Sequence, residues 1–117
     1  MADLPARDRA NLELVLELIA HITRRLDDMT LERFVADRDE VDLTAYRLAA
    51  IGEATRKLSP DLKDRHPETP WAAIYGMRNI VAHEYGAVIP ARVWNVTTDH
   101  LDALVAVCRA ELRNIPR

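Results

Sequence analysis

The sequence has little of several residues on which common site chemistries depend. Its 117 residues include a single cysteine, Cys108, which excludes an intramolecular disulfide and lies in an apolar helical pattern typical of a buried position. The single serine, Ser59, precedes a proline and is explained as a helix cap, so a serine nucleophile has no support. The sequence also lacks a glycine-rich phosphate loop, a cysteine pair and two histidines four residues apart. We therefore expect neither a metal site nor a bound cofactor.

Long apolar runs and glycines are also scarce. No run approaches the roughly 20 apolar residues that span a bilayer, and the first residues lack the apolar core of a signal peptide. We expect a cytoplasmic protein with no membrane association. Only three glycines occur among many Leu, Ala, Arg and Glu residues, which favours helices over strands. A chain of this length predicts one domain over residues 1–117.

The formal net charge of −3 argues against a strongly basic, non-specific nucleic-acid binder. It does not exclude a local basic groove. Of the 16 basic residues all but Lys57 and Lys63 are arginine, a bias that suits two-pronged phosphate contacts but equally fits a genomic preference.

A long amphipathic helix is predicted over residues 7–29. Leu14 and Leu18 widen its apolar surface beyond one stripe, which suggests that it faces both its own core and a partner subunit. The main stripe has helical spacing and consists of Leu12, Val15, Leu16, Ile19, Ile22 and Leu26.

The second long helix is predicted over residues 41–58, after a short turn capped by Thr30 and an acidic helix start at residues 37–40. Small residues on this helix, among them Gly52, would let another helix approach closely. Glu53 has two readings here: a solvated surface carboxylate, or the partner of an arginine across the bundle.

Two pairs of a capping residue and a proline follow. Ser59-Pro60 predicts a short turn, and Thr69-Pro70 predicts the start of a third helix that continues through Arg78. His66 falls in the connector, where we expect an exposed loop residue without a role. Pro90 begins a final helix that carries Cys108 and has a kink near residues 97–99. The predicted fold is an all-α, antiparallel four-helix bundle with short extra turns.

The densest cluster of site chemistry lies at residues 77–86, which read Met-Arg-Asn-Ile-Val-Ala-His-Glu-Tyr-Gly. Arg78 offers a fork of donors suited to a phosphate, His83 changes protonation near neutral pH, and Tyr85 carries a modifiable hydroxyl. This combination is typical of a phosphodiester site. The structural alternative is that Arg78 pairs with a carboxylate, His83 caps a helix end and Tyr85 packs at the bundle edge.

The spacing within this cluster does not converge on one helix. At about 100° per residue, Arg78 and Tyr85 share a face while His83 points well away from both. Either the helix ends or distorts near His83, with Gly86 just past its end, or two copies of the chain share the site.

The order arginine, polar residue, three residues, histidine, one residue, tyrosine resembles the signature of the HepT-like branch of the HEPN domains. The resemblance covers nearly the whole chain. The further segments that carry it are Ile51-Gly52-Glu53-Ala54, Leu58-Ser59, Pro70-Trp71, Gly76-Met77 and Val93-Trp94.

The resemblance implies an all-helical, two-fold homodimeric toxin with metal-independent ribonuclease activity. It also implies a neighbouring nucleotidyltransferase antitoxin, MntA-like, that adenylylates the motif tyrosine, here Tyr85. In this scheme Arg78 stabilises the transition-state charge, His83 acts as acid or base, and Asn79 orients the phosphate or the histidine. Glu84 is expected to face solvent.

One histidine per chain supplies one proton-transfer role at a time, so two chains sharing a cleft would supply both. The rival function is a non-catalytic HEPN module that binds a nucleotide, an RNA or the antitoxin without cutting.

Overall fold

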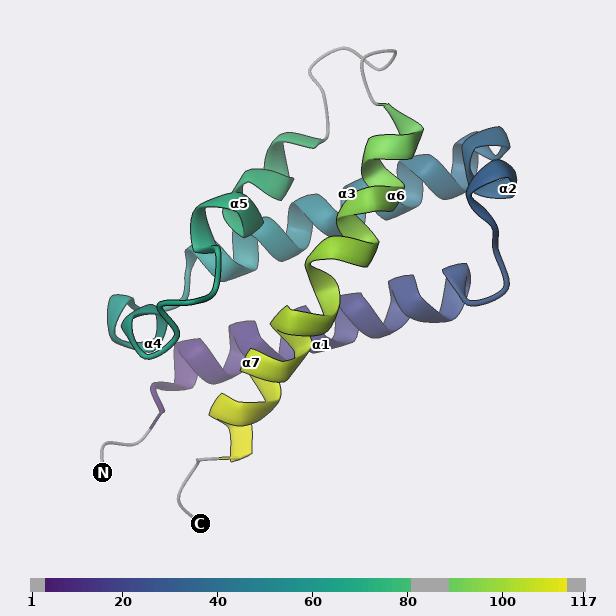
Figure 1. The fold of residues 1–117 in the computed structure, drawn as a ribbon. Helices are drawn as coiled ribbons and strands as arrows, with labels where there is room; N and C mark the ends of the chain where they lie inside the picture. The colour runs from purple at the N-terminus through teal and green to yellow at the C-terminus, as the bar shows by residue number, and fades with distance from the viewer. Residues whose placement is uncertain (1–3, 81–88, 114–117) are drawn as a thin grey trace.

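The computed structural model describes residues 4–80 and 89–113, and Figure 1 shows that these residues form helices joined by short turns. No strand occurs in these two ranges, so the all-α prediction is confirmed. The helices are α1 (Ala6–Leu26), α2 (Leu31–Ala36), α3 (Arg38–Arg56), α4 (Pro60–Asp64), α5 (Trp71–Tyr75), the 3₁₀ helix η1 (Gly76–Ile80), α6 (Pro90–Asp99) and α7 (Leu101–Arg113).

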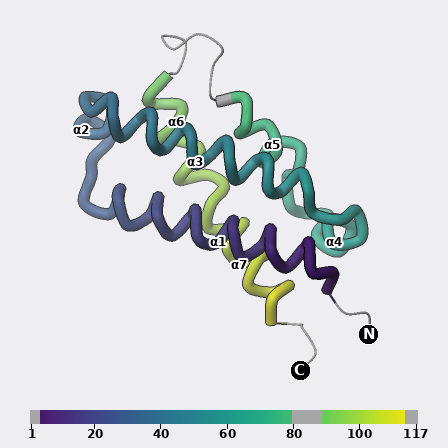
Figure 2. Tube along the Cα trace, turned by 180° about the vertical axis from the view of Figure 1, so that it is seen from behind, coloured from purple at the N-terminus to yellow at the C-terminus, as the bar shows by residue number. Residues whose placement is uncertain are grey.

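The two longest helices, α1 and α3, lie side by side and run in opposite directions (Figures 1 and 2). The apolar stripe predicted on α1 faces the core: Leu12, Val15, Ile19 and Ile22 are buried. Of the two extra leucines on this helix, Leu18 packs against the core, whereas Leu14 is 42% exposed. Only Leu14 therefore adds apolar surface outside the core.

Side-chain caps begin α2, α3 and α4, as the sequence predicts. One residue before each of these three helices, a hydroxyl or carboxylate oxygen accepts a hydrogen bond from a backbone N–H of the first turn, which satisfies a group that the helix itself leaves unpaired. The three hydrogen bonds run from Arg33 N to Thr30 Oγ1 at 3.2 Å, from Glu40 N to Asp37 Oδ1 at 3.2 Å and from Leu62 N to Ser59 Oγ at 3.3 Å.

Helices α6 and α7 cross the α1–α3 pair and complete the core (Figure 1). The predicted kink is a complete break, because His100 separates the two helices. Phe34 of α2 contacts Trp94 of α6, with the ring centroids 5.2 Å apart. Cys108 on α7 is fully buried, as expected for a small hydrophobic residue.

The predicted third helix is shorter and more irregular than expected. Pro70, one residue later than predicted, occupies the N-cap position, and no side chain caps the helix. The α-helical part ends at Tyr75, and η1 continues the segment to Ile80. At Gly76 the backbone has φ −60° and ψ −16°, values of the tighter 3₁₀ geometry. Glycine is a poor α-helix former, which explains the change at this residue.

The backbones of α3 and η1 come together at Gly52. A Cβ atom at this position would lie 2.9 Å from Arg78 N and 2.9 Å from Tyr75 O, closer than Cβ atoms approach other atoms. The predicted close approach on the small-residue face of α3 is thus confirmed, and only glycine fits there.

Polar contacts hold the end of the molecule where α1 begins, α4 lies and α7 ends (Figure 2). The buried Asp8 accepts hydrogen bonds from Ser59 N at 2.9 Å and Ser59 Oγ at 2.6 Å. Glu111, 6% exposed, contacts Arg65 and His66, each at 2.6 Å. The expectation that His66 is an exposed loop residue is therefore wrong, because its side chain is largely buried and one ring nitrogen is hydrogen-bonded to Glu111, which is distant in sequence.

In the part of the chain that the structure describes, no helix is long and apolar enough to cross a membrane. The four-helix-bundle topology, the two-fold dimer and the single domain over residues 1–117 stay predictions.

Candidate functional site

Arg78 lies on η1, beside the C-terminal half of α3. Its Nη1 is 3.5 Å from Glu53 Oε2, and its side chain is 46% exposed. The Glu53 side chain is 37% exposed, so the pair lies at the surface. Of the two sequence readings of Glu53, the structure supports the partner of an arginine on another helix.

Arg56, one turn after Glu53 on α3, binds the other oxygen of the same carboxylate. Arg56 Nε and Nη2 donate to Glu53 Oε1 at 2.9 Å and 2.6 Å. These hydrogen bonds, with the nearby charges of Arg56 and Arg78, hold the pKa of the Glu53 carboxyl below its usual range. Glu53 is therefore ionised at neutral pH.

The Tyr75 ring contacts the Arg78 guanidinium, with Cζ 4.9 Å from the ring centroid. This distance is typical of a cation–π contact. Side chains three residues apart eclipse each other along a 3₁₀ helix, so the change of geometry at Gly76 brings this tyrosine and arginine together.

Asn79 is described and exposed, and no contact of its side chain supports or opposes the orienting role expected for it. His83, Glu84, Tyr85 and Gly86 lie outside the described residues. Their predicted roles, and the two alternatives for the spacing of Arg78 and His83, are therefore untested. The rotation of about 100° per residue assumed in the sequence analysis does not hold between Gly76 and Ile80, because a 3₁₀ helix such as η1 turns by about 120° per residue.

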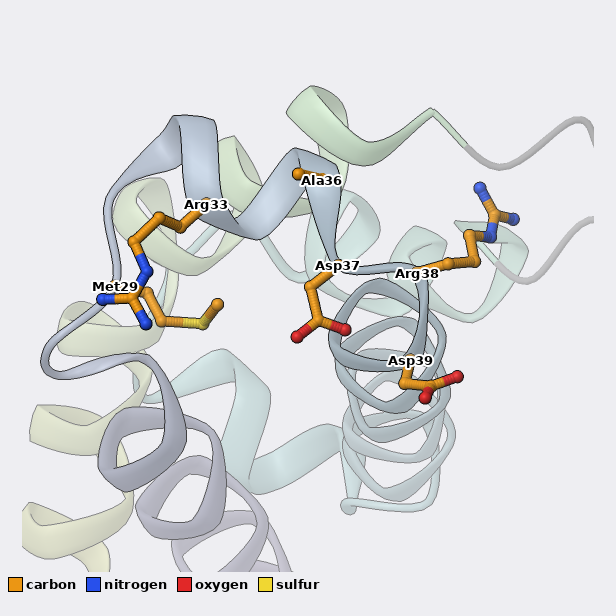
Figure 3. Close-up of a pocket in the computed structure, with 6 residues that line it drawn as sticks. All are labelled: Met29, Arg33, Ala36, Asp37, Arg38 and Asp39. Carbon is orange, nitrogen blue, oxygen red and sulfur yellow. The ribbon is translucent and has the colours of Figure 1, made fainter.

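An open depression of about 400 Å³ lies where α2 meets α3, and Figure 3 shows the six residues that line it. Three of its four polar side chains already serve local structure. Asp37 caps α3, Arg33 donates to Asp28 O at 3.3 Å, and Arg38 forms a 3.0 Å ion pair with Asp42. Figure 3 shows Arg38 pointing away from the other side chains. This depression is therefore no candidate site.

A second hollow, of about 310 Å³, lies between the end of α1 and the α6–α7 junction. Ile22, Leu26, Trp94 and Leu101 give it an apolar floor, and it holds neither a histidine nor an arginine. Within residues 4–80 and 89–113, no group of three or more His, Cys, Asp or Glu is arranged to hold a metal ion.

The described residues are all-helical and present a half-exposed arginine, Arg78, from a 3₁₀ helix. In the sequence, a histidine and a tyrosine follow this arginine. The chain belongs to the "Ribonuclease HepT-like" family, whose model matches residues 15–111. The resemblance inferred from the motif is thus confirmed.

Named relatives cover most of the chain. "Putative RNase MJ0127" of Methanocaldococcus jannaschii is 29% identical over 94 residues, which make up 80% of this chain and 78% of the relative. "Putative RNase TTE0752" of Caldanaerobacter subterraneus is 29% identical over 96 residues, 82% and 86% of the two chains. "Probable ribonuclease HepT" of Thermococcus cleftensis is 30% identical over 89 residues, which make up 76% of this chain and 78% of the relative. No solved structure gives a significant match.

Sequence reasoning did not find the contributions of Arg56 and Tyr75. Both carried a signal, since each lies three residues from its contact partner, Glu53 and Arg78 respectively. Spacing of this kind places side chains on one helical face. The signal is common on any helix, however, and acquires meaning only once η1 is placed against α3.

Proposed function

We propose that this protein is the toxin of a toxin–antitoxin pair and acts as a metal-independent endoribonuclease. The observation that carries the proposal is Arg78, which is half-exposed and held by Glu53 and Tyr75 at the first position of the Arg78–His83–Tyr85 motif. Membership in the HepT-like family, and relatives named as RNases, support RNA as the substrate.

The proposed reaction is cleavage of RNA by its own 2′-hydroxyl. A base removes the proton of the 2′-hydroxyl, whose oxygen attacks the adjacent phosphorus. The bond from phosphorus to the 5′-oxygen breaks, and an acid protonates the leaving oxygen. The products are a 2′,3′-cyclic phosphate and a 5′-hydroxyl end.

In this reaction Arg78 stabilises the negative charge that develops on the phosphoryl oxygens, because a fixed guanidinium matches their geometry. His83 serves as the base or the acid. A two-fold dimer with two Arg78 and two His83 in one cleft supplies both proton-transfer roles. Asn79 orients the phosphate or the histidine.

Cleavage of a labelled RNA by purified protein, in the presence of EDTA, tests the proposal. Arg78→Ala and His83→Ala should each lower the rate by on the order of 10² to 10⁴, because each removes a charge-stabilising or proton-transfer group. Cleavage that EDTA stops, or that both variants retain in full, contradicts the mechanism. Binding of RNA without cleavage by the parent protein supports the rival function, a non-catalytic module.

Arg25→Ala is the matched control for the arginine variant. Arg25 has the same 46% side-chain exposure as Arg78 and also pairs with a glutamate of α3, Glu40. It lies on α1, away from η1. Arg25→Ala should cleave RNA at the rate of the parent protein. A loss of rate in Arg78→Ala alone would then come from the site arginine and not from the loss of a surface ion pair.

Regulation by the partner is proposed to act at Tyr85. A nucleotidyltransferase would transfer AMP from ATP to the tyrosine hydroxyl and release pyrophosphate. The added phosphate would occupy Arg78, and the adenosine would block RNA, so the nuclease would be silenced. After co-expression with the neighbouring transferase, intact mass should show added AMP that is absent from Tyr85→Phe. Neutralisation of a protein with unmodified mass would instead indicate inhibition by complex formation.

A further inference from the structure

One carboxylate, that of Glu53, joins two arginines from different helical segments. Oε1 accepts both hydrogen bonds from Arg56, at 2.9 Å and 2.6 Å, within α3. Oε2 faces Arg78 Nη1 of η1 at 3.5 Å. The carboxylate is thus anchored on its own helix by one oxygen and reaches the proposed site arginine with the other.

The backbone fixes this arrangement. Gly52, the residue before Glu53, touches the backbone of both Tyr75 and Arg78, and any side chain at this position would force the segments apart. The start points of the Glu53 and Arg78 side chains are therefore set by packing of α3 against η1. Most surface ion pairs join two long side chains whose backbones are not held together by a contact of this kind.

Arg78 is restrained from two directions. The Tyr75 ring lies 4.9 Å from its Cζ, and Glu53 contacts one of its two Nη nitrogens. A guanidinium carries five N–H donors, so donors remain for a phosphate after one Nη contacts Glu53. With 46% of the side chain exposed, a ligand can reach it.

We infer that Glu53 is a positioning residue for Arg78, and that together with Tyr75 it holds the guanidinium ready for the phosphate of an RNA substrate before that substrate binds. This inference rests on the proposed nuclease function. Arginine loses rotamer freedom when it pairs with the charge that develops on the phosphoryl oxygens in the transition state, and a restraint already present in the unbound protein lowers that cost. Orientation of this kind acts on the rate of the chemical step.

Glu53 is not itself a suitable proton-transfer group near neutral pH. The hydrogen bonds from Arg56, together with the two positive charges, hold the pKa of its carboxyl below the usual range. An efficient general base has a pKa close to the working pH. The fixed negative charge and the geometry of its two oxygens are what Glu53 contributes.

Glu53→Gln tests the inference, with Glu40→Gln as the matched control. Both glutamates lie on α3 and accept hydrogen bonds from an arginine, and Glu40 binds Arg25 Nε at 3.0 Å and 3.1 Å through its two oxygens. In the RNA cleavage assay kcat of Glu53→Gln should fall on the order of 10-fold. Its KM should stay the same or fall, since a negative charge that repels RNA is removed. Glu40→Gln should keep both constants.

A second readout follows the arginine directly. The ¹⁵N order parameter of Arg78 Nε in the RNA-free protein should drop in Glu53→Gln and stay unchanged in Glu40→Gln, because only the first removes the negative charge that pairs with Arg78. A merely structural role of Glu53 would leave this value unchanged in the folded protein. If Glu53→Gln does not fold, Glu53→Asp keeps the charge and shortens the reach, and should show the same fall in kcat and in order parameter.

The double variant separates action through Arg78 from independent action. In an Arg78→Ala background, Glu53→Gln should cause no further loss of the residual rate. Additive losses would overturn the inference, as would an active parent in which Glu53→Gln changes neither kcat nor the order parameter. Those results leave the proposed nuclease function intact. A parent protein that does not cleave RNA overturns the function and the inference together.

Discussion

At the scale of single residues, two glycines in neighbouring segments have opposite environments. A Cβ at Gly52 would lie 2.9 Å from two backbone atoms, which have no rotamer with which to move away. A Cβ at Gly76 meets nothing within 4 Å, and φ at Gly76 is −60°, a value that alanine adopts readily. The same substitution should therefore have opposite effects at the two positions.

We predict that Gly52→Ala lowers the free energy of unfolding by about 1 to 2 kcal/mol, since overpacking outweighs the gain in helix propensity. Gly76→Ala should raise it by about 0.4 to 1 kcal/mol, because alanine restricts the unfolded chain. Urea unfolding followed by circular dichroism measures both. Equal effects of the two substitutions would contradict the close contact of α3 with η1.

Cys108 gives a second prediction at this scale. Burial among apolar side chains raises the pKa of its thiol to about 12, so almost no thiolate exists at neutral pH. A thiol reagent should react with the native protein only as fast as the protein unfolds. It should react fully once urea well above the unfolding midpoint has unfolded the chain. Rapid reaction of the native protein would show that the α7 face is open.

At the scale of helical elements, α4 links two distant parts of the chain. Ser59 connects it to Asp8 of α1, and Arg65 and His66, just after it, connect to Glu111 of α7. The Arg65 guanidinium, with His66 beside it, holds the pKa of the Glu111 carboxyl below its usual range despite burial. The ionised form of Glu111 therefore stabilises the folded state.

We predict that Glu111→Gln lowers the free energy of unfolding by about 1 to 3 kcal/mol at pH 7, the range for charged hydrogen bonds. Glu68→Gln is the matched control. Glu68 also faces His66, but at 3.8 Å and with 71% of its side chain exposed, so its removal should change stability by less than about 0.5 kcal/mol. Equal losses for the two variants would contradict the arrangement around Glu111.

The pH dependence has a definite sign. Because the folded-state pKa of Glu111 lies below its value in the unfolded chain, its stabilisation is complete above the unfolded value of about 4.3 and is lost as the pH falls through the folded value. The stability gap between parent and Glu111→Gln should therefore close as the pH falls below about 4. Urea unfolding at a series of pH values checks this, and a gap that grows as the pH falls below about 4 would contradict it.

At the scale of the whole molecule, the proposed site depends on a second copy of the chain. The described surface leaves Leu14, Leu31, Val35, Tyr46 and Ile89 between 38% and 68% exposed. Large apolar side chains of this exposure are compatible with an interface, but they do not identify the partner. Function can report on the dimer more directly.

We predict that mixing Arg78→Ala and His83→Ala subunits restores part of the activity. After exchange, about half of the dimers would be mixed, and a shared cleft would then hold one intact Arg78 and one intact His83. The single histidine would supply one proton-transfer role and water the other, so the restored activity should stay below that of the parent. Each variant alone should remain inactive under the same conditions. Sedimentation that shows only monomer at micromolar concentration, or mixtures as inactive as their components, would rule out the shared cleft.

The sequence by itself determined what depends on neighbouring residues. Helical spacing identified the buried stripe of α1, and Thr30, Asp37 and Ser59 marked helix starts, because caps and amphipathic faces arise within one or two turns. The order of Arg78, His83 and Tyr85, together with the matching segments along the rest of the chain, indicated the family, which the family model confirms.

Only the tertiary structure decided which distant groups meet. The close contact at Gly52 selected Glu53 as the partner of Arg78, although either reading of Glu53 suited the sequence. His66 and Glu111 are 45 residues apart in the chain, and no local pattern announces their hydrogen bond. The physical reason is the same in both cases: helix formation depends on residues within a few positions, whereas the pairing of charges between helices depends on how their backbones pack.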